Sequence, residues 1–302
     1  MEYKEFLEEV MEKIKNYLPD EYQDRTLFLE SKYQNEIKQE GIIISKPGEL
    51  CPILYLERFY EDYVNGFADK ETIYKSIAKE YQEAELFAKE IPIPDSNRLE
   101  DYLEQSFFKA MNYEKNKSWL QGEPYILLHD IALVPYIDIT DDAKMRITSS
   151  YLSQTNIKKE ELLKYVLENN ARVLKPQFKS MQEILNELSD QKYEEEESPS
   201  MYVLTGKEKK CGASLIADAK LMQRIREQIG EDYYVLPSSI HETLILPQSK
   251  APDPTELKEM VMAVNRSEVE PEDFLSDNVY KYKASRKAIE LAVPDKSRER
   301  RR

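Results

Sequence analysis

The sequence predicts an α+β protein in which antiparallel sheets carry helices packed on one face. Segments with apolar residues at three-and-four spacing, typical of amphipathic helices, alternate with short runs rich in β-branched and aromatic residues, typical of strands. Proline, glycine and aspartate stand where these segments should begin or end. No repeat with the period of a solenoid is present.

The N-terminal stretch predicts a helix followed by a hairpin. Apolar residues at helical spacing run from Phe6 to Leu18, and Pro19 should stop the helix. The runs Thr26–Tyr33 and Gly41–Ser45 favour strands and should pair as a hairpin. Cys51–Tyr55 then predicts a short strand that leads into a second helix.

Three helix boundaries follow. Gly66 should end the second helix, because glycine adopts the left-handed conformation common at helix ends. Asp69 should cap the longest helix of the chain by accepting a hydrogen bond from a free backbone N–H. The segment Ile91-Pro92-Ile93-Pro94 should end that helix, because proline disfavours helical structure in the residue before it.

The middle of the chain predicts a second hairpin and more helices. Residues 99–112 fit a helix and a strand equally well. Tyr125–Ile139 and Met145–Leu152 favour strands, which Asp141-Asp142 should join as a turn. One helix should follow from about Lys158 to Asn169. Another should begin at Ser180-Met181-Gln182-Glu183, a capping box.

The clearest predicted boundary is the run DQKYEEEESPS at 190–200, where four consecutive glutamates repel one another. We therefore expect a linker or loop there, between two α+β regions. The predicted regions are 1–189 with possible sub-regions 1–94 and 95–189, the acidic segment 190–200, the C-terminal region 201–292, and a disordered basic tail at 293–302.

The C-terminal region predicts the element order β-α-β-β-α-β with one extra strand. That order is ferredoxin-like, with two helices on one face of an antiparallel sheet. The helices should begin at Asp218 and Asp253, and Gly230 should end the first of them. The expected strands are Met201–Thr205, Tyr233–Leu236, Ile240–Leu246, Asn278–Lys283 and Lys287–Leu291.

Composition excludes several classes of function. The net charge of −15 opposes non-specific nucleic-acid binding, except weakly through the basic tail Lys296–Arg302. No apolar run approaches the ~20 residues that a membrane span requires, and the N-terminus lacks a signal-peptide core. We therefore expect a cytoplasmic protein in which Cys51 and Cys211 stay reduced.

Motifs that would identify a cofactor or metal are absent from the sequence. There is no HExxH, CxxC pair, GxGxxG or GxxxxGK[ST], so we expect no cofactor and no metal. The one place with a hydroxyl, an imidazole and a carboxylate together is Ser239, His241 and Glu242. On an extended strand His241 and Glu242 would point to opposite faces, so the sequence favours a structural His241 on a sheet face over a catalytic triad.

Several blocks resemble an uncharacterised, domain-of-unknown-function family of anaerobic Gram-positive bacteria. They are MYVLT at Met201–Thr205, LPSSIHE at Leu236–Glu242, LSDNVYKY at Leu275–Tyr282 and PILYLERFYEDYVNG at Pro52–Gly66. The resemblance covers nearly the whole chain and implies no activity or catalytic residue. Because that family is sometimes found on mobile elements, the resemblance implies an accessory role.

Two functions of different classes remain open from the sequence. The favoured one is a non-enzymatic binding or regulatory factor that recognises another protein through an acidic surface bearing some of the 21 tyrosines. The alternative is a hydrolase or nuclease whose carboxylates converge only in the folded chain. A pocket holding several carboxylates, or an acid beside His241, would favour the enzyme.

Overall fold

The computed structural model describes residues 1–46, 51–91, 99–140, 143–188, 200–207 and 209–293. Its contacts divide the chain into two units, Met1–Ile93 and Pro94–Arg302. Both units combine helices with antiparallel sheets, so the predicted α+β class is confirmed. The predicted turn at Asp141-Asp142, most of the acidic segment 190–200 and most of the basic tail lie outside the described residues.

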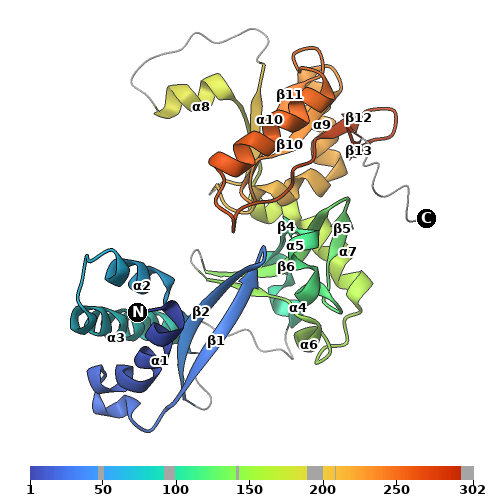
Figure 1. Cartoon of the computed structure of the whole chain (residues 1–302). Coiled ribbons are helices and arrows are strands. Elements are labelled where there is room, and N and C mark those ends of the chain that lie inside the picture. The colour runs from blue at the N-terminus through green and yellow to red at the C-terminus, as the bar shows by residue number, and fades with distance from the viewer. Residues whose placement is uncertain (47–50, 92–98, 141–142, 189–199, 208, 294–302) are drawn as a thin grey trace. The chain divides into compact units, whose positions relative to one another are not determined.

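The first unit packs helices on a three-stranded sheet of order β1-β2-β3 (Figure 1). The predicted hairpin is confirmed, although its second strand begins at Ile37 instead of Gly41. The predicted cap is also confirmed, because the Asp69 side chain accepts a hydrogen bond from the Thr72 backbone. The elements are α1 (Tyr3–Lys13), two 3-10 turns (Ile14–Tyr17 and Asp20–Tyr22), β1 (Thr26–Gln34), β2 (Ile37–Ser45), β3 (Leu54–Tyr55), α2 (Glu57–Val64) and α3 (Lys70–Glu90).

The core of this unit lies between the helices and one face of the sheet. Ile42 and Ile44 of β2 are fully buried, as are Ile77 and Tyr81 of α3. The Tyr81 hydroxyl also accepts a hydrogen bond from the Ile44 backbone N–H at 2.7 Å. Burial of these large side chains is the main favourable term that stabilises the unit.

The second unit contains a four-stranded and a six-stranded sheet. Its first part holds α4 (Leu99–Tyr102), a 3-10 turn (Leu103–Gln105), β4 (Ser106–Asn112), α5 (Tyr113–Leu120), β5 (Ile126–Leu128), β6 (Ile131–Thr140), β7 (Ala143–Arg146), α6 (Ser149–Leu152), α7 (Lys159–Leu174), β8 (Gln177–Ser180) and α8 (Met181–Leu188). Its second part holds β9 (Tyr202–Thr205), the 3-10 helix η5 (Gly212–Ala217), α9 (Ala219–Ile229), β10 (Tyr233–Pro237), β11 (Glu242–Pro247), α10 (Pro254–Ser267), β12 (Tyr280–Lys283) and β13 (Ala288–Leu291).

Two predictions for the four-stranded sheet need correction. The single strand predicted over Tyr125–Ile139 is two strands, β5 and β6, separated by a turn at His129, which has a φ of 58°. The strand predicted over Met145–Leu152 ends at Arg146. Thr148 then caps the short helix α6 by accepting a hydrogen bond from the Tyr151 backbone. The ambiguous residues 99–112 contain both a helix and a strand.

The ferredoxin-like order predicted for the C-terminal region is not confirmed. The six-stranded sheet has the order β13-β12-β10-β11-β9-β8, and every neighbouring pair is antiparallel. The ferredoxin-like arrangement is a split βαβ unit, in which strands joined through a helix run parallel. In that arrangement the fourth strand lies beside the first. Here β12 lies beside β10, and β9 lies between β11 and β8, so the same order of elements along the chain produces another topology.

Both faces of the six-stranded sheet are covered, which corrects the prediction of helices on one face. Tyr233 and Val235 of β10 pack into the core that contains α9 and η5. The alternate residues Tyr234 and Leu236 pack on the opposite face, against Leu257 and its neighbours on α10. The alternation of side chains along a strand gives β10 two buried faces.

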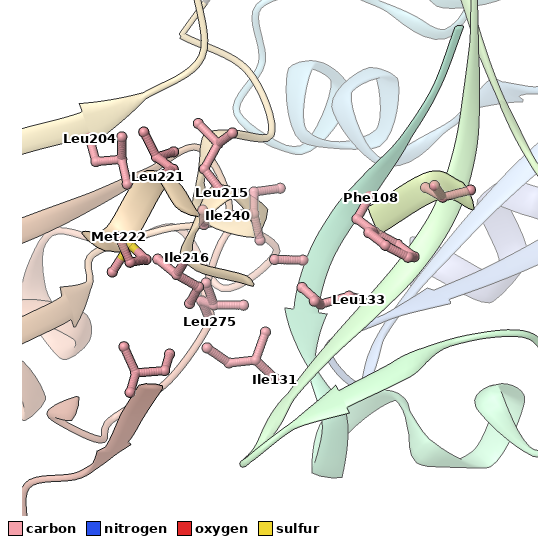
Figure 2. Packing of buried hydrophobic residues seen from close by; sticks show 14 of the residues in the cluster. Phe108, Ile131, Leu133, Leu204, Leu215, Ile216, Leu221, Met222, Ile240 and Leu275 are labelled. Carbon is pink, nitrogen blue, oxygen red and sulfur yellow. The ribbon is translucent and has the colours of Figure 1, made fainter. Parts of the chain in front are cut away.

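One hydrophobic core joins residues on both sides of the acidic segment. Figure 2 shows Ile131 and Leu133 of β6 pointing toward Leu275 and Ile216 from the C-terminal part. The predicted boundary at 190–200 therefore does not separate two cores. Within the described residues, no helix is both long enough and apolar enough to span a bilayer.

Candidate functional site

The second unit contains a pocket of about 170 Å³ in which basic side chains gather. Its lining comes from the four-stranded sheet, the C-terminal end of α7 and the loop that follows β9. The lining residues are Phe107, Asp138, Lys144, Val173, Leu174, Lys175, Lys207, Lys210 and Cys211. Four lysines against one aspartate make this pocket basic in a chain whose net charge is −15.

The side chains that line the pocket range from buried to exposed. Phe107 and Cys211 are buried, whereas Lys175, Lys207 and Lys210 are exposed. Between them, Asp138 of β6 and Lys144 of β7 are directly opposite each other on paired strands, and their side chains form an ion pair of 3.0 Å. That pair neutralises the one carboxylate of the lining, so the exposed lysines provide a surplus of positive charge.

The end of α7 and the loop after β9 are tied together beside the pocket. Lys175 caps α7 in the left-handed conformation, with a φ of 49°. The Lys207 backbone N–H donates a hydrogen bond of 2.9 Å to the carbonyl of Leu174, the last residue of α7. This bond holds Lys175 and Lys207 on adjoining segments and fixes where the loop begins.

The far end of that loop is held by close backbone packing at Gly212. A Cβ atom at this position would lie 2.5 Å from the Gly206 nitrogen and 2.6 Å from the His241 carbonyl oxygen, so only glycine fits. The Gly212 N–H donates a hydrogen bond of 2.9 Å to that carbonyl. Lys210 and Cys211 therefore line the pocket directly before this tightly packed glycine.

Cys211 is a weak candidate for a nucleophile. Burial raises the pKa of its thiol, and the nearby carboxylate of Asp138 acts in the same direction. The positive charges of Lys109, Lys144 and Lys210 act to lower that pKa but do not outweigh burial. The thiol is therefore protonated near neutral pH, and the thiolate is the reactive form of cysteine.

His241 is not among the residues that line the pocket, but its side chain contacts the backbone of the loop after β9. Its Nδ1 atom accepts a hydrogen bond of 3.3 Å from the Cys211 backbone N–H. Its Nε2 atom lies 3.5 Å from an oxygen of Asp273, which belongs to the segment after α10. The imidazole therefore holds the backbone of the pocket loop on one side and lies beside a carboxylate on the other.

The structure does not place His241 on a sheet face, which corrects that prediction. Strand β11 begins one residue later, at Glu242, and the His241 backbone N–H donates to the Ser239 hydroxyl at 3.0 Å. Ser239 thus shapes the turn before β11. The acid beside the imidazole is Asp273, not Glu242, so the three residues that the sequence singled out do not form a relay.

The lysines of the pocket were not identified as site residues from the sequence, although one signal was present. The segment GKEKKCG at 206–212 is a local basic run in an acidic chain. Lys144 and Lys175 carry no such signal, because they come from elements distant in sequence. Among the described residues, no group of three or more His, Cys, Asp and Glu side chains is arranged to hold a metal ion.

Comparison with known proteins gives one match. The model of the Family of unknown function (DUF5688) matches residues 3–284, nearly the whole chain. No curated protein and no solved structure matches the chain.

Proposed function

We propose a function for this chain, which belongs to the DUF5688 family of unknown function, on the basis of its pocket. In this proposal the chain is a non-enzymatic protein that binds a small anion. The observation that carries this proposal is the convergence of Lys144, Lys175, Lys207 and Lys210 on one pocket of an acidic chain. Lysine ammonium groups are common ligands of phosphate, which they bind as point charges.

The size of the pocket supports a small ligand or the anionic group of a larger one. Its volume of about 170 Å³ is below the ~300–1,000 Å³ typical of sites for drug-sized ligands. A phosphate ester or an inorganic oxyanion matches both this volume and the surplus of positive charge. The buried, protonated thiol of Cys211 adds no negative charge to the pocket.

The wider role that we propose is that of a regulatory or accessory factor in the bacterial cytoplasm. Its association with mobile elements, and the recognition of another protein through tyrosines, stay predictions. Tyr81, Tyr233, Tyr280 and Tyr282 are buried in the cores and contribute no interface.

Asp273 beside His241 is a feature that would favour the hydrolase or nuclease alternative. However, the Nδ1 atom of that imidazole accepts from the Cys211 backbone and the nearby Ser239 hydroxyl accepts from the backbone N–H of the same histidine, so the binding role stays our proposal.

The first prediction tests the pocket with inorganic phosphate as the probe. We expect saturable binding to the full chain in isothermal titration calorimetry. The double variant Lys207→Gln/Lys210→Gln removes two exposed cations and should weaken this binding at least about tenfold, since a hydrogen bond to a charged group contributes ~1.5–3 kcal/mol.

A matched control removes the same charge elsewhere. Lys220 and Lys250 are exposed and lie outside the pocket, so Lys220→Gln/Lys250→Gln should leave phosphate affinity nearly unchanged. Absence of saturable binding to the wild type, or equal losses in the two double variants, would contradict an anion site in this pocket.

A further inference from the structure

Strand β1 of the first unit presents an open edge. It is the terminal strand of the sheet β1-β2-β3, and among the described strands it pairs only with β2. It is nine residues long and carries exposed apolar side chains, with Phe28 49%, Leu29 38% and Tyr33 53% exposed. A long edge of this kind is a template for pairing with another strand.

The hydrogen bonds of β2 show which backbone groups of β1 point to the open edge. The Leu56 N–H donates to the Glu40 carbonyl at 2.9 Å, so the backbone of Glu40 faces β3. Backbone groups alternate in direction along a strand, so Gly41 faces β1, where it is opposite Glu30. Glu30 therefore faces β2, and its neighbours Leu29 and Ser31 present their N–H and C=O groups to the open edge.

The side chains alternate in the same way. Glu30 and Lys32 share one face of the sheet, and both are exposed. Leu29 and Tyr33 share the other face. The Lys32 ammonium lies 5.7 Å from the centre of the Tyr55 ring, on the same face as Glu30. The edge thus carries an acidic and a basic residue two positions apart, with Ser31 between them.

We propose that this edge pairs with the β1 edge of a second copy of the chain, antiparallel, about a two-fold axis at Ser31. In this register Glu30 is opposite the partner's Lys32, and Leu29 is opposite the partner's Tyr33. Two-fold symmetry repeats each contact, so two ion pairs and two apolar pairs form. The two three-stranded sheets become one continuous sheet of two copies.

Charge selects this register over its neighbours. A residue whose backbone groups face the open edge can be opposite only a residue of the same kind in the partner strand. The nearest alternative registers therefore shift one strand by two residues along the other, which moves the two-fold axis by one residue. An axis at Glu30 would place two glutamates directly opposite each other, and an axis at Lys32 would place two lysines opposite each other. Like charges that are directly opposite destabilise a pair of strands, whereas opposite charges stabilise it.

The test is the oligomeric state of the full chain, measured by sedimentation velocity over a range of concentrations. We expect a dimer for the wild type. The variants Glu30→Lys and Lys32→Glu each place like charges opposite at both symmetric positions. Each should therefore raise the dimer dissociation constant by roughly tenfold or more.

Two further samples, in which opposite charges again face each other, make the test specific to this register. The double variant Glu30→Lys/Lys32→Glu restores opposite charges and should dimerise like the wild type. An equimolar mixture of the two single variants should form a heterodimer, because each lysine then meets a glutamate. A monomeric wild type overturns the proposal. So does a dimer that the single variants leave intact, because that dimer would use another surface.

Discussion

Glu85 of α3 and Arg25 form a buried ion pair in the first unit, with side chains 4% and 6% exposed. The Tyr22 hydroxyl donates a hydrogen bond of 2.6 Å to the same carboxylate, and the Arg25 guanidinium lies 4.0 Å from the centre of the Tyr22 ring. This network links α3 to the turn that precedes β1. Its charges are compensated only as long as all its members are present.

The second prediction is that Glu85→Gln destabilises the first unit by about 3 kcal/mol, because it leaves the Arg25 charge buried without its counter-ion. The measurement is urea denaturation followed by far-UV circular dichroism, since the single tryptophan, Trp119, lies in the second unit. The control is Glu80→Gln. Glu80 pairs with Arg58 at 2.5 Å, but the side chains are 37% and 63% exposed, so its loss should cost less than about 1 kcal/mol.

The pH dependence provides a second readout of the same pair. Burial alone would raise the pKa of Glu85, but the hydrogen bonds from Tyr22 and Arg25 and the charge of Arg25 outweigh it and lower that pKa. A lowered pKa stabilises the fold above the unfolded value of ~4.3, and this contribution disappears as the pH falls through the folded value. The stability difference between wild type and Glu85→Gln should therefore shrink below about pH 4. A constant difference would contradict this assignment.

At the scale of elements, α7 is joined to its neighbours by a buried amide. Asn170 is fully buried, and its Oδ1 accepts a hydrogen bond of 2.8 Å from the Phe108 backbone in β4. Its Nδ2 lies 3.3 Å from both the carbonyl and the hydroxyl of Ser214 in η5. One side chain thus fixes the helix that supplies Lys175 against the elements that flank the pocket.

The third prediction is that Asn170→Ala destabilises the second unit by about 2–4 kcal/mol. The change leaves the Phe108 N–H buried without a partner, which costs ~1–3 kcal/mol, and also opens a small cavity. Trp119 fluorescence during urea denaturation measures the effect. The variant Gln228→Ala, at an exposed position of α9, should change stability by less than about 0.5 kcal/mol. Similar midpoints for the two variants would show that the amide is unimportant.

At the scale of the whole molecule, the two units differ in independence. The core of the first unit is built from Phe6 to Tyr81 without residues of the second. The C-terminal region 201–292 shares its core with Leu133, Leu162 and other side chains from before the acidic segment. A region that depends on side chains from elsewhere in the chain lacks part of its hydrophobic stabilisation when it is isolated.

The fourth prediction concerns fragments. Residues 1–93 expressed alone should unfold in one cooperative thermal transition. Residues 201–292 alone should not, because η5 would lose its packing against β4 and α7, and β9 would lose its partner strand β8. Circular dichroism on both fragments makes the comparison, with residues 94–302 as the positive control. A cooperative melt of 201–292 would instead support the boundary that the sequence predicts.

The sequence by itself determined the class of the fold and many of its local boundaries. Asp218 caps α9 and Asp253 caps α10 by accepting backbone hydrogen bonds, and Gly230 ends α9 with a φ of 89°. The β1-β2 hairpin was also predictable. These features depend on residues that are near one another along the chain, so their physical causes can be read from short segments.

The tertiary structure alone decided the strand order and the pocket. The order of elements from β9 to β13 is compatible with more than one sheet, and only long-range pairing placed β12 beside β10. Likewise, Lys144 and Lys210 are far apart in sequence and meet because β7 and the loop after β9 pack around one cavity. Contacts between distant segments form where total burial and hydrogen bonding are best satisfied, which is a property of the whole chain and not of any segment within it.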